Sequence, residues 1–242
     1  MYRKNKESFV SNVKNSLVST SPENSFLINC YDILVTGENS GFIKEGFFMF
    51  IPEIVKEGYQ KDTRMSMETK FFQDRTVFLE GEITSETANC MVKQLLILAK
   101  ESTEPINIYI NSGGGSVNAG LLIYDVIQSI QSQVNIYVTG MAASMAAVLA
   151  CCGEKGRRYI LPHSQCMIHE PLINGGVGGS TSAIRNISES LLKTRELTNG
   201  IIAKHTGKSM EEVEQACSYD HYLDAEEAVE FGLVDEIVTT LL

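Results

Sequence analysis

Residues 134–147 of the chain read VNIYVTGMAASMAA and indicate the architecture of the whole sheet. The segment Val134–Thr139 is apolar and rich in β-branched residues, which is typical of a buried strand. Gly140 marks a sharp turn, and the alanine-rich stretch from Ala142 to Cys152 predicts a short, closely packed helix. A strand followed by a turn and a helix is the building block of a parallel α/β sheet.

Ser144 stands in the first turn of that predicted helix. The first amides of a helix have no intrahelical partner and carry the positive end of the dipole, so they favour developing negative charge nearby. A hydroxyl in this position is a candidate nucleophile. The alternative is that Ser144 is only another small residue in a closely packed alanine helix.

Alternating strand and helix patterns continue on both sides of this segment and indicate right-handed crossovers. The expected strands are Thr76–Leu79, Ile106–Ile110, Arg158–Leu161, Cys166–His169 and Leu233–Val238, and the expected helices are Glu86–Lys100, Val117–Ser132 and Ala183–Lys204. Two capping boxes, Ser209 with Glu212 and Asp224 with Glu227, predict two further helices. The helix Ala183–Lys204 is longer than a compact domain needs, so we expect it to project or to pack against a partner.

Composition limits the possible classes of protein. A chain of 242 residues with 43% apolar residues can bury one principal core. Its net charge of −10 argues against a nucleic-acid surface and against attachment to anionic lipid. The six cysteines form no CxxC pair and no zinc-ligand spacing, so we expect no metal and reduced thiols in a cytoplasmic protein. The apolar run 134–152 is interrupted by polar residues, which favours a core segment over a membrane span.

Reactive residues follow three of the expected strands. Active sites in parallel α/β sheets lie beyond the carboxyl ends of strands, so these residues are expected to approach one another. Acyl transfer needs a hydroxyl, an imidazole, an orienting carboxylate and amides for the oxyanion. Ser144, His169 and the backbone amides of Gly115 and Met145 can fill three of these roles. The chain has thirty acidic residues, so spacing alone does not identify the orienting carboxylate. The glycine run alone could also serve only to form a tight turn, and His169 alone could have a purely structural role.

Several motifs, in the same order along residues 51–240, resemble the ClpP family of Clp protease proteolytic subunits. They are GMAASM at 140–145, VNAG at 117–120, MIH at 167–169 followed by Pro171 and Leu172, DHYL at 220–223, and EAVEFGLVD at 227–235. The resemblance implies that Asp220 is the carboxylate, which completes a catalytic triad with Ser144 and His169. It also implies an α/β fold of the ClpP/crotonase type, with repeated β-α-β units and a protruding handle helix.

The family resemblance implies a serine endopeptidase subunit of a compartmentalised protease. Such subunits form heptameric rings, stacked in pairs as a tetradecamer, and an AAA+ unfoldase that uses ATP delivers unfolded proteins to them. The subunit itself then needs no cofactor. By this resemblance residues 49–242 are the peptidase domain with a handle at about 172–204, residues 1–48 are an extension or pro-segment, and residues 51–64 are a pore loop.

The resemblance also implies binding residues. Gly114, Ser116, Val117 and Leu172 are expected to bind an extended substrate between the strand after Gly115 and a handle strand that begins at Leu172. Tyr109 is expected to belong to an apolar pocket that receives loops of the unfoldase.

The chain departs from the family pattern in four places. The family usually has proline at Gly113, glutamine at Glu170, Asp-Arg at Ser218-Tyr219, and tyrosine at Asn107. Because neighbours on a strand point to opposite sides, we expect the Glu170 carboxylate to face away from His169.

Three alternative functions remain. The chain could be a regulatory subunit of mixed rings or a peptidase that works without an unfoldase. A crotonase-type acyl-CoA enzyme is disfavoured, because that chemistry has no need for serine, histidine and aspartate together.

Overall fold

The computed structural model describes residues 27–28, 54–56, 63–173 and 178–241, and the chain divides into two compact units, Met1–Lys70 and Phe71–Leu242. The first unit holds a small antiparallel sheet of β1 (Leu27–Ile28), β2 (Ile54–Lys56) and β3 (Thr63–Met65). Most of the expected extension 1–48 and of the pore loop 51–64 lies outside the described residues, as do residues 174–177 of the handle. The domain boundary at residue 49 stays a prediction.

The second unit is built on a mostly parallel sheet. Its strands are β4 (Thr76–Ile83), β5 (Ile106–Gly115), β6 (Val134–Ala143), β7 (Arg158–Ile160), β8 (Gln165–Ile168), β9 (His221–Leu223) and β10 (Glu236–Ile237). The main order is β10-β7-β6-β5-β4, and every neighbouring pair along it is parallel. β8 adds to β6 in parallel, and β9 pairs with β8 antiparallel. The predicted parallel α/β sheet is therefore confirmed, and the antiparallel β9 is an addition that the strand pattern did not indicate.

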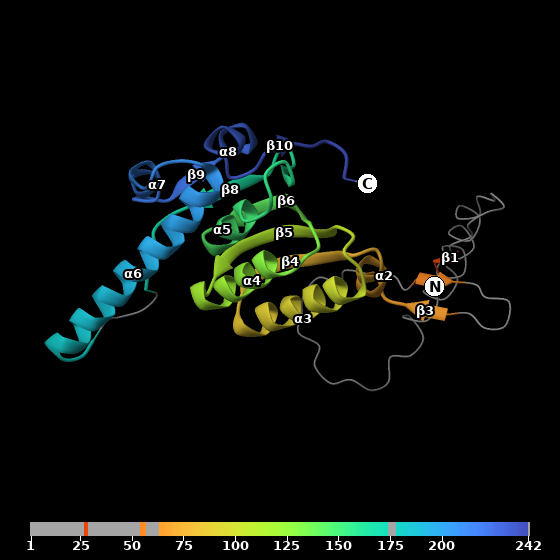
Figure 1. Cartoon of the computed structure of the whole chain (residues 1–242), viewed down its shortest axis with the longest axis horizontal. Helices are drawn as coiled ribbons and strands as arrows, with labels where there is room; N and C mark the ends of the chain where they lie inside the picture. Colours follow the sequence, from red (N-terminus) through yellow and green to blue (C-terminus); the bar gives the residue numbers. More distant parts are fainter. Residues whose placement is uncertain (1–26, 29–53, 57–62, 174–177, 242) are drawn as a thin grey trace, which may run out of the picture. The chain divides into compact units, whose positions relative to one another are not determined.

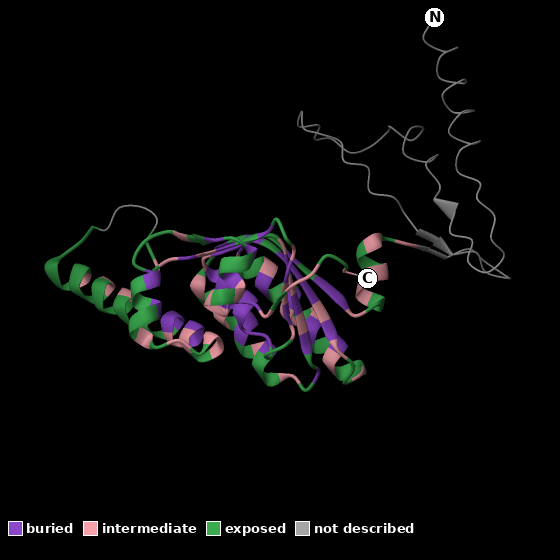
Figure 2. Cartoon of the chain, turned by 90° about the horizontal axis from the view of Figure 1, so that it is seen from above, coloured by how far each residue is buried: buried purple, intermediate pink, exposed green. Residues whose placement is uncertain are grey.

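Seven helices are described, and several of them pack against the sheet. They are α2 (Met67–Gln73), α3 (Ser85–Glu101), α4 (Val117–Ser129), α5 (Met145–Cys151), α6 (Thr181–Thr206), α7 (Met210–Ala216) and α8 (Ala225–Phe231). α3 and α4 pack together below β4 and β5 in Figure 1, and α5 packs against β5 and β6. Figure 2 shows the buried residues concentrated in the sheet and in the helix faces turned toward it. All seven residues of α5 are buried, and its three alanines let the helix lie close to the strands.

Two central strands are longer than the sequence indicates. β5 continues from Ile110 to Gly115, and β6 continues from Thr139 to Ala143. The register shifts inside both extensions, so glycines that read as turn residues instead belong to bulged strand ends. This extension carries the reactive segments of β5 and β6 alongside each other.

The predicted helix caps are present. Ser209 with Glu212 and Asp224 with Glu227 form reciprocal capping boxes at α7 and α8. A third box, Thr84 with Thr87, begins α3. The sequence analysis missed it because the usual signature has glutamate or glutamine in the position of Thr87.

Helix α6 confirms the expected projecting helix. It has 26 residues, and its buried residues are confined to its last third, at Thr198, Asn199, Ile201 and Ile202. The preceding turns extend away from the sheet and are mostly exposed (Figures 1 and 2). None of the described helices has the length and apolar character needed to cross a membrane.

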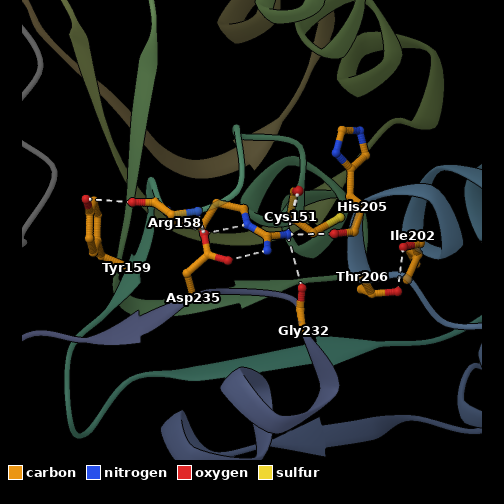
Figure 3. A network of polar contacts seen from close by, with 9 residues as sticks. Cys151, Arg158, Tyr159, Ile202, His205, Thr206, Gly232 and Asp235 are labelled. Atoms are coloured by element: carbon orange, nitrogen blue, oxygen red, sulfur yellow. Dashed lines mark hydrogen bonds and ion pairs between the residues drawn. The ribbon is translucent and has the colours of Figure 1, made fainter.

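Arg158 joins the ends of three helices (Figure 3). The residue is 2% exposed, and its Nη1 donates to the carbonyls of Cys151, His205 and Gly232 at 3.0 to 3.2 Å. These carbonyls lie at the carboxyl ends of α5, α6 and α8, where a cation satisfies unpaired acceptors and the negative ends of the helix dipoles. Asp235 pairs with the same guanidinium at 2.5 Å and neutralises its charge.

Candidate active site

Ser144 lies at the junction of β6 and α5. It is the N-cap residue of α5 rather than a residue of the first turn, which corrects the predicted helix start at Ala142. Its backbone has φ 54° and ψ −123°, an uncommon conformation for a residue with a β-carbon that costs about 1–3 kcal/mol. The Ser144 amide donates to Met167 O at 2.8 Å, which ties this turn to β8. The side chain makes no capping hydrogen bond, so its hydroxyl is available to another partner.

His169 is that partner. It follows the last residue of β8, and its Nε2 lies 2.8 Å from Ser144 Oγ. With the imidazole proton on Nδ1, Nε2 accepts the hydroxyl proton of Ser144. The side chain of His169 is only 14% exposed, which limits competition from water.

Asp220 lies on the other side of the imidazole. Its Oδ1 is 3.4 Å from His169 Nδ1, which is longer than an ordinary hydrogen bond, and its side chain is 66% exposed. The strand register explains the approach: Ile168 of β8 pairs with His221 of β9, so the next positions outward bring His169 and Asp220 together. Residues 51 positions apart thus meet because β9 is antiparallel to β8.

The glycine run of β5 lies directly against the nucleophile. A β-carbon at Gly114 would come within 2.6 Å of Ala143 O, 2.8 Å of Ser144 Cβ and 3.0 Å of Met145 N. Gly115 has φ 151°, and a β-carbon there would lie 2.4 Å from Ile83 O. Only glycine allows both approaches. The structure therefore brings the predicted oxyanion residues Gly115 and Met145 to the same end of the sheet as Ser144.

A narrow depression of about 20 Å³ opens beside Ser144. This volume is little more than one water molecule needs. It is lined by Val117, Ser144, Met145, Val148, Ile168, His169, Pro171, Thr198 and Ile202. The side chain of Thr198 presents no free donor, because its hydroxyl donates to the carbonyls of Thr194 and Arg195 within α6. The wall is therefore mainly apolar, and the polar atoms converge at the Ser144 and His169 end.

The remaining predicted substrate residues flank this depression. Ser116 caps α4, and its hydroxyl oxygen accepts from the Ala119 amide at 3.4 Å. Leu172 is 57% exposed and follows Pro171 of the lining. Residues 171–173 have no regular secondary structure, so the expected handle strand at Leu172 is not formed here. Within the described residues, no cluster of histidine, cysteine, aspartate or glutamate is arranged to hold a metal ion.

Glu170 has an ion-pair partner on α6, and its predicted orientation away from His169 stays a prediction. Its backbone amide donates to Cys217 O at 2.8 Å, and its carboxylate lies 3.4 Å from Arg195 Nη1 on α6. Both side chains of this pair are at least 40% exposed, so the pair contributes little stability.

Tyr109 belongs to a row of aromatic side chains that crosses the sheet. Phe78, Tyr109, Tyr137 and Tyr159 occupy directly paired positions on β4, β5, β6 and β7. Neighbouring rings stack with centroids 4.9 to 5.4 Å apart. Burial raises the pKa of the Tyr109 and Tyr137 hydroxyls. The sequence analysis named only Tyr109, although the alternation of large side chains along each strand also marks the other three.

The row lies on the sheet face opposite the core. The neighbours Ile108 and Ile110 pack in the hydrophobic core, whereas Tyr109 does not, and its hydroxyl donates to Leu241 O at 3.4 Å. Asn107 stands where the family usually has tyrosine, and its side-chain oxygen accepts a hydrogen bond from Asn135 Nδ2 at 2.9 Å. This face of the sheet is therefore polar at Asn107 and Asn135 and aromatic along the row, and its role as a partner pocket stays a prediction.

Two comparisons with known proteins show which family the chain resembles. A family model described as Clp protease matches residues 59–241. The ATP-dependent Clp protease proteolytic subunit of Ligilactobacillus salivarius (strain UCC118) is 40% identical over 189 residues, which cover 78% of this chain and 95% of that protein.

Proposed function

The chain belongs to the Clp protease family, and on that premise we propose that it is a serine endopeptidase subunit that cleaves unfolded proteins. The observation that carries the proposal is the 2.8 Å contact between Ser144 Oγ and His169 Nε2. Asp220 at the other ring nitrogen supplies the carboxylate that this chemistry needs.

The proposed reaction has two steps, acylation of Ser144 and hydrolysis of the acyl-enzyme. Ser144 Oγ attacks the scissile carbonyl carbon while its proton passes to His169 Nε2, and Asp220 stabilises the resulting imidazolium. The amides of Gly115 and Met145 donate to the oxyanion. His169 then protonates the leaving amine, which yields an acyl-enzyme. In the second step, water attacks the acyl carbon and gives a proton to His169. The bond between the acyl carbon and Ser144 Oγ then breaks, and His169 returns the proton to Oγ, which releases the acid and regenerates Ser144.

Substrate recognition is proposed to rely on the peptide backbone. An extended chain would lie along Gly114–Val117 on one side and Leu172 on the other, with its main chain hydrogen-bonded as an added strand. The residue before the cleaved bond would place its side chain in the narrow apolar depression lined by Val148 and Ile202. This arrangement favours small or flexible apolar side chains there and tolerates most sequences elsewhere.

An ATPase partner is part of the same proposal. The name of the relative from Ligilactobacillus salivarius describes a subunit of an ATP-dependent protease. We assign the aromatic row with Tyr109 as the surface that receives apolar loops of an AAA+ unfoldase. Two heptameric rings would associate through α6, whose exposed turns carry Ile184, Leu192 and Leu197. The free thiols of the five described cysteines agree with a cytoplasmic location.

Hydrolysis of a short fluorogenic peptide with an apolar residue before the cleaved bond tests this function. We expect the wild-type protein to cleave it and Ser144→Ala to lose at least three orders of magnitude in kcat. The variant removes only one hydroxyl oxygen, so particle mass should be unchanged. Cleavage by Ser144→Ala at the wild-type rate would contradict the nucleophile assignment.

The same samples separate a catalytic subunit from a regulatory one. A regulatory subunit would form rings of full mass, show no Ser144-dependent hydrolysis alone, and raise activity only when mixed with a second related subunit. Hydrolysis by the purified chain alone would exclude a purely regulatory role.

A further inference from the structure

Ser112 has a buried hydroxyl that the proposed mechanism does not use. The residue lies in β5, two positions before Gly114, and is 2% exposed. Its Oγ donates to Gly81 O of β4 at 2.5 Å and accepts from the Gly114 amide at 3.1 Å. One hydroxyl thus joins the neighbouring strand to the segment that lies against Ser144.

The backbone ladder is interrupted where this hydroxyl acts. The register between β4 and β5 shifts after Glu80, so that Gly81 faces two residues of β5, Ser112 and Gly113. The register between β5 and β6 also shifts between Ile110 and Ser112. A bulge leaves residues without ladder partners, and the hydroxyl of Ser112 replaces a missing cross-strand link.

Gly114 is the residue that this link holds. Its backbone fits against Ala143 O and Met145 N with no room for a β-carbon, and its φ is +90°. Gly115, the proposed oxyanion donor, follows directly. Any rotation at Gly114 therefore moves the Gly115 amide relative to Ser144.

Flexibility of the neighbouring residue makes this link more important. Gly113 has no atom within 4 Å of the place where a β-carbon would lie, so packing does not restrain it. Proline, which the family usually has at this position, would hold φ near −65°. Here glycine leaves that torsion free, so the hydrogen bond from the Gly114 amide to the Ser112 hydroxyl restrains the loop at the next residue.

We propose that Ser112 is a positioning residue that holds the Gly114–Gly115 backbone in the orientation needed to bind the oxyanion. It touches neither substrate nor the reacting atoms and acts through the Gly114 amide. The inference rests on the proposed function, because it assigns a role within the same peptidase site.

Ser112→Ala tests the role, with Ser132→Ala as a matched control. Ser132 is 4% exposed, and its hydroxyl also donates to a carbonyl, that of Ser102, at 3.0 Å. It lies two residues before Val134, the first residue of β6, at the other end of that strand from Ser144. The control therefore loses a buried hydroxyl of the same kind without touching the glycine run.

We expect kcat for the fluorogenic peptide to fall by about tenfold or more in Ser112→Ala, with KM within twofold of wild type. Loss of a whole oxyanion donor costs about 10²- to 10³-fold, and a loosened donor should cost less. Affinity for a peptide boronate, which forms a tetrahedral adduct on the serine, should fall by the same factor as kcat/KM. In Ser132→Ala both quantities should stay within twofold of wild type.

A second-site change provides the rescue. Gly113→Pro in the Ser112→Ala background restricts the loop by fixing φ at residue 113. It should restore at least half of the decrease in log kcat that Ser112→Ala causes. Amide exchange of residues 113–116 should be faster in Ser112→Ala and slower again in the double variant. If Ser112→Ala fails to assemble, Ser112→Cys carries the same test, because its thiol fills similar space with weak hydrogen bonding.

The failures of the two ideas are distinguishable. A kcat for Ser112→Ala within twofold of Ser132→Ala, while Ser144→Ala still abolishes hydrolysis, would overturn the positioning role alone. Hydrolysis that does not depend on Ser144 would overturn the proposed function.

Discussion

Asp220 is the most exposed member of the proposed triad. Its side chain is 66% exposed and lies 3.4 Å from His169 Nδ1, whereas Ser144 and His169 are already in contact at 2.8 Å. Water therefore competes for the carboxylate more than for the other two residues. Its main contribution is expected to be orientation of the imidazole and stabilisation of the imidazolium during the reaction.

Asp220→Asn should lower kcat by about 10²- to 10⁴-fold without changing KM or particle mass, because the amide favours the wrong imidazole tautomer. Peptide hydrolysis against pH measures the effect. Glu170→Gln is the matched control, since it neutralises a neighbouring exposed carboxylate that pairs with Arg195 instead. A loss in Glu170→Gln equal to that in Asp220→Asn would show that the general negative charge matters, and not the contact with His169.

The ends of α5, α6 and α8 depend on one ion pair. Burial by itself raises the pKa of Asp235, but hydrogen bonds and charge from Arg158, with the Gly156 and Arg158 amides, hold it below its ordinary value. Burial lowers the pKa of His205 to about 4, and the charges of Lys204 and Arg158 act in the same direction. Both groups bind fewer protons in the folded chain than in the unfolded chain, so acid favours unfolding.

The two groups act in different pH ranges. The contribution of His205 is complete above its ordinary pKa of 6.5 and is lost as the pH falls toward 4. The contribution of Asp235 is present above the ordinary value of 3.8 and is lost as the pH falls further. His205→Gln should therefore flatten the decline in free energy of unfolding between pH 6.5 and 4, measured with urea at fixed protein concentration.

Asp235→Asn should act already at neutral pH. It leaves the buried Arg158 charge unpaired, so we expect a loss of about 3–5 kcal/mol in the free energy of unfolding at pH 7. Below pH 4, the free energy of unfolding should fall less steeply with decreasing pH in this variant than in wild type. Glu236→Gln, at the next and exposed position, is the control and should change neither quantity. An unchanged stability of Asp235→Asn would mean that the pair contributes no net free energy.

Helix α6 carries exposed apolar side chains along the turns that precede Thr198. Leu192 is 52% exposed and Leu197 is 50% exposed, while the buried part of α6 begins only at Thr198. An amphipathic helix that projects in this way is normally covered by another chain. The proposed ring-to-ring contact would supply that cover.

Leu192→Asp should weaken the contact between rings, because it places a charge in an apolar interface. The expected result is a fall of particle mass from a double ring to a single ring, measured by sedimentation. Lys193→Asp changes charge at the neighbouring position without removing an apolar side chain and should retain the full mass. A double ring in Leu192→Asp would mean that α6 does not form this interface.

Local patterns in the chain were enough to predict the parallel strands, the two capping boxes and the position of His169 at the end of a strand, but they placed Ser144 inside the first helical turn and not at the N-cap. Periodicity, turn residues and caps act over a few neighbouring residues, so they can be read without the fold. The same local signals placed the ends of β5 and β6 too early, because a glycine in a turn and a glycine in a bulge look alike in sequence.

Contacts between distant segments could be identified only in the folded chain. No local pattern selects Asp220 among thirty acidic residues, and only the family resemblance named it before β9 was seen beside β8. The Ser112–Gly81 hydrogen bond joins residues 31 positions apart, and the Arg158–Asp235 pair joins residues 77 positions apart. Such contacts depend on strand register and helix packing. Both are determined by many segments at once, because these segments bury their apolar residues in one common core.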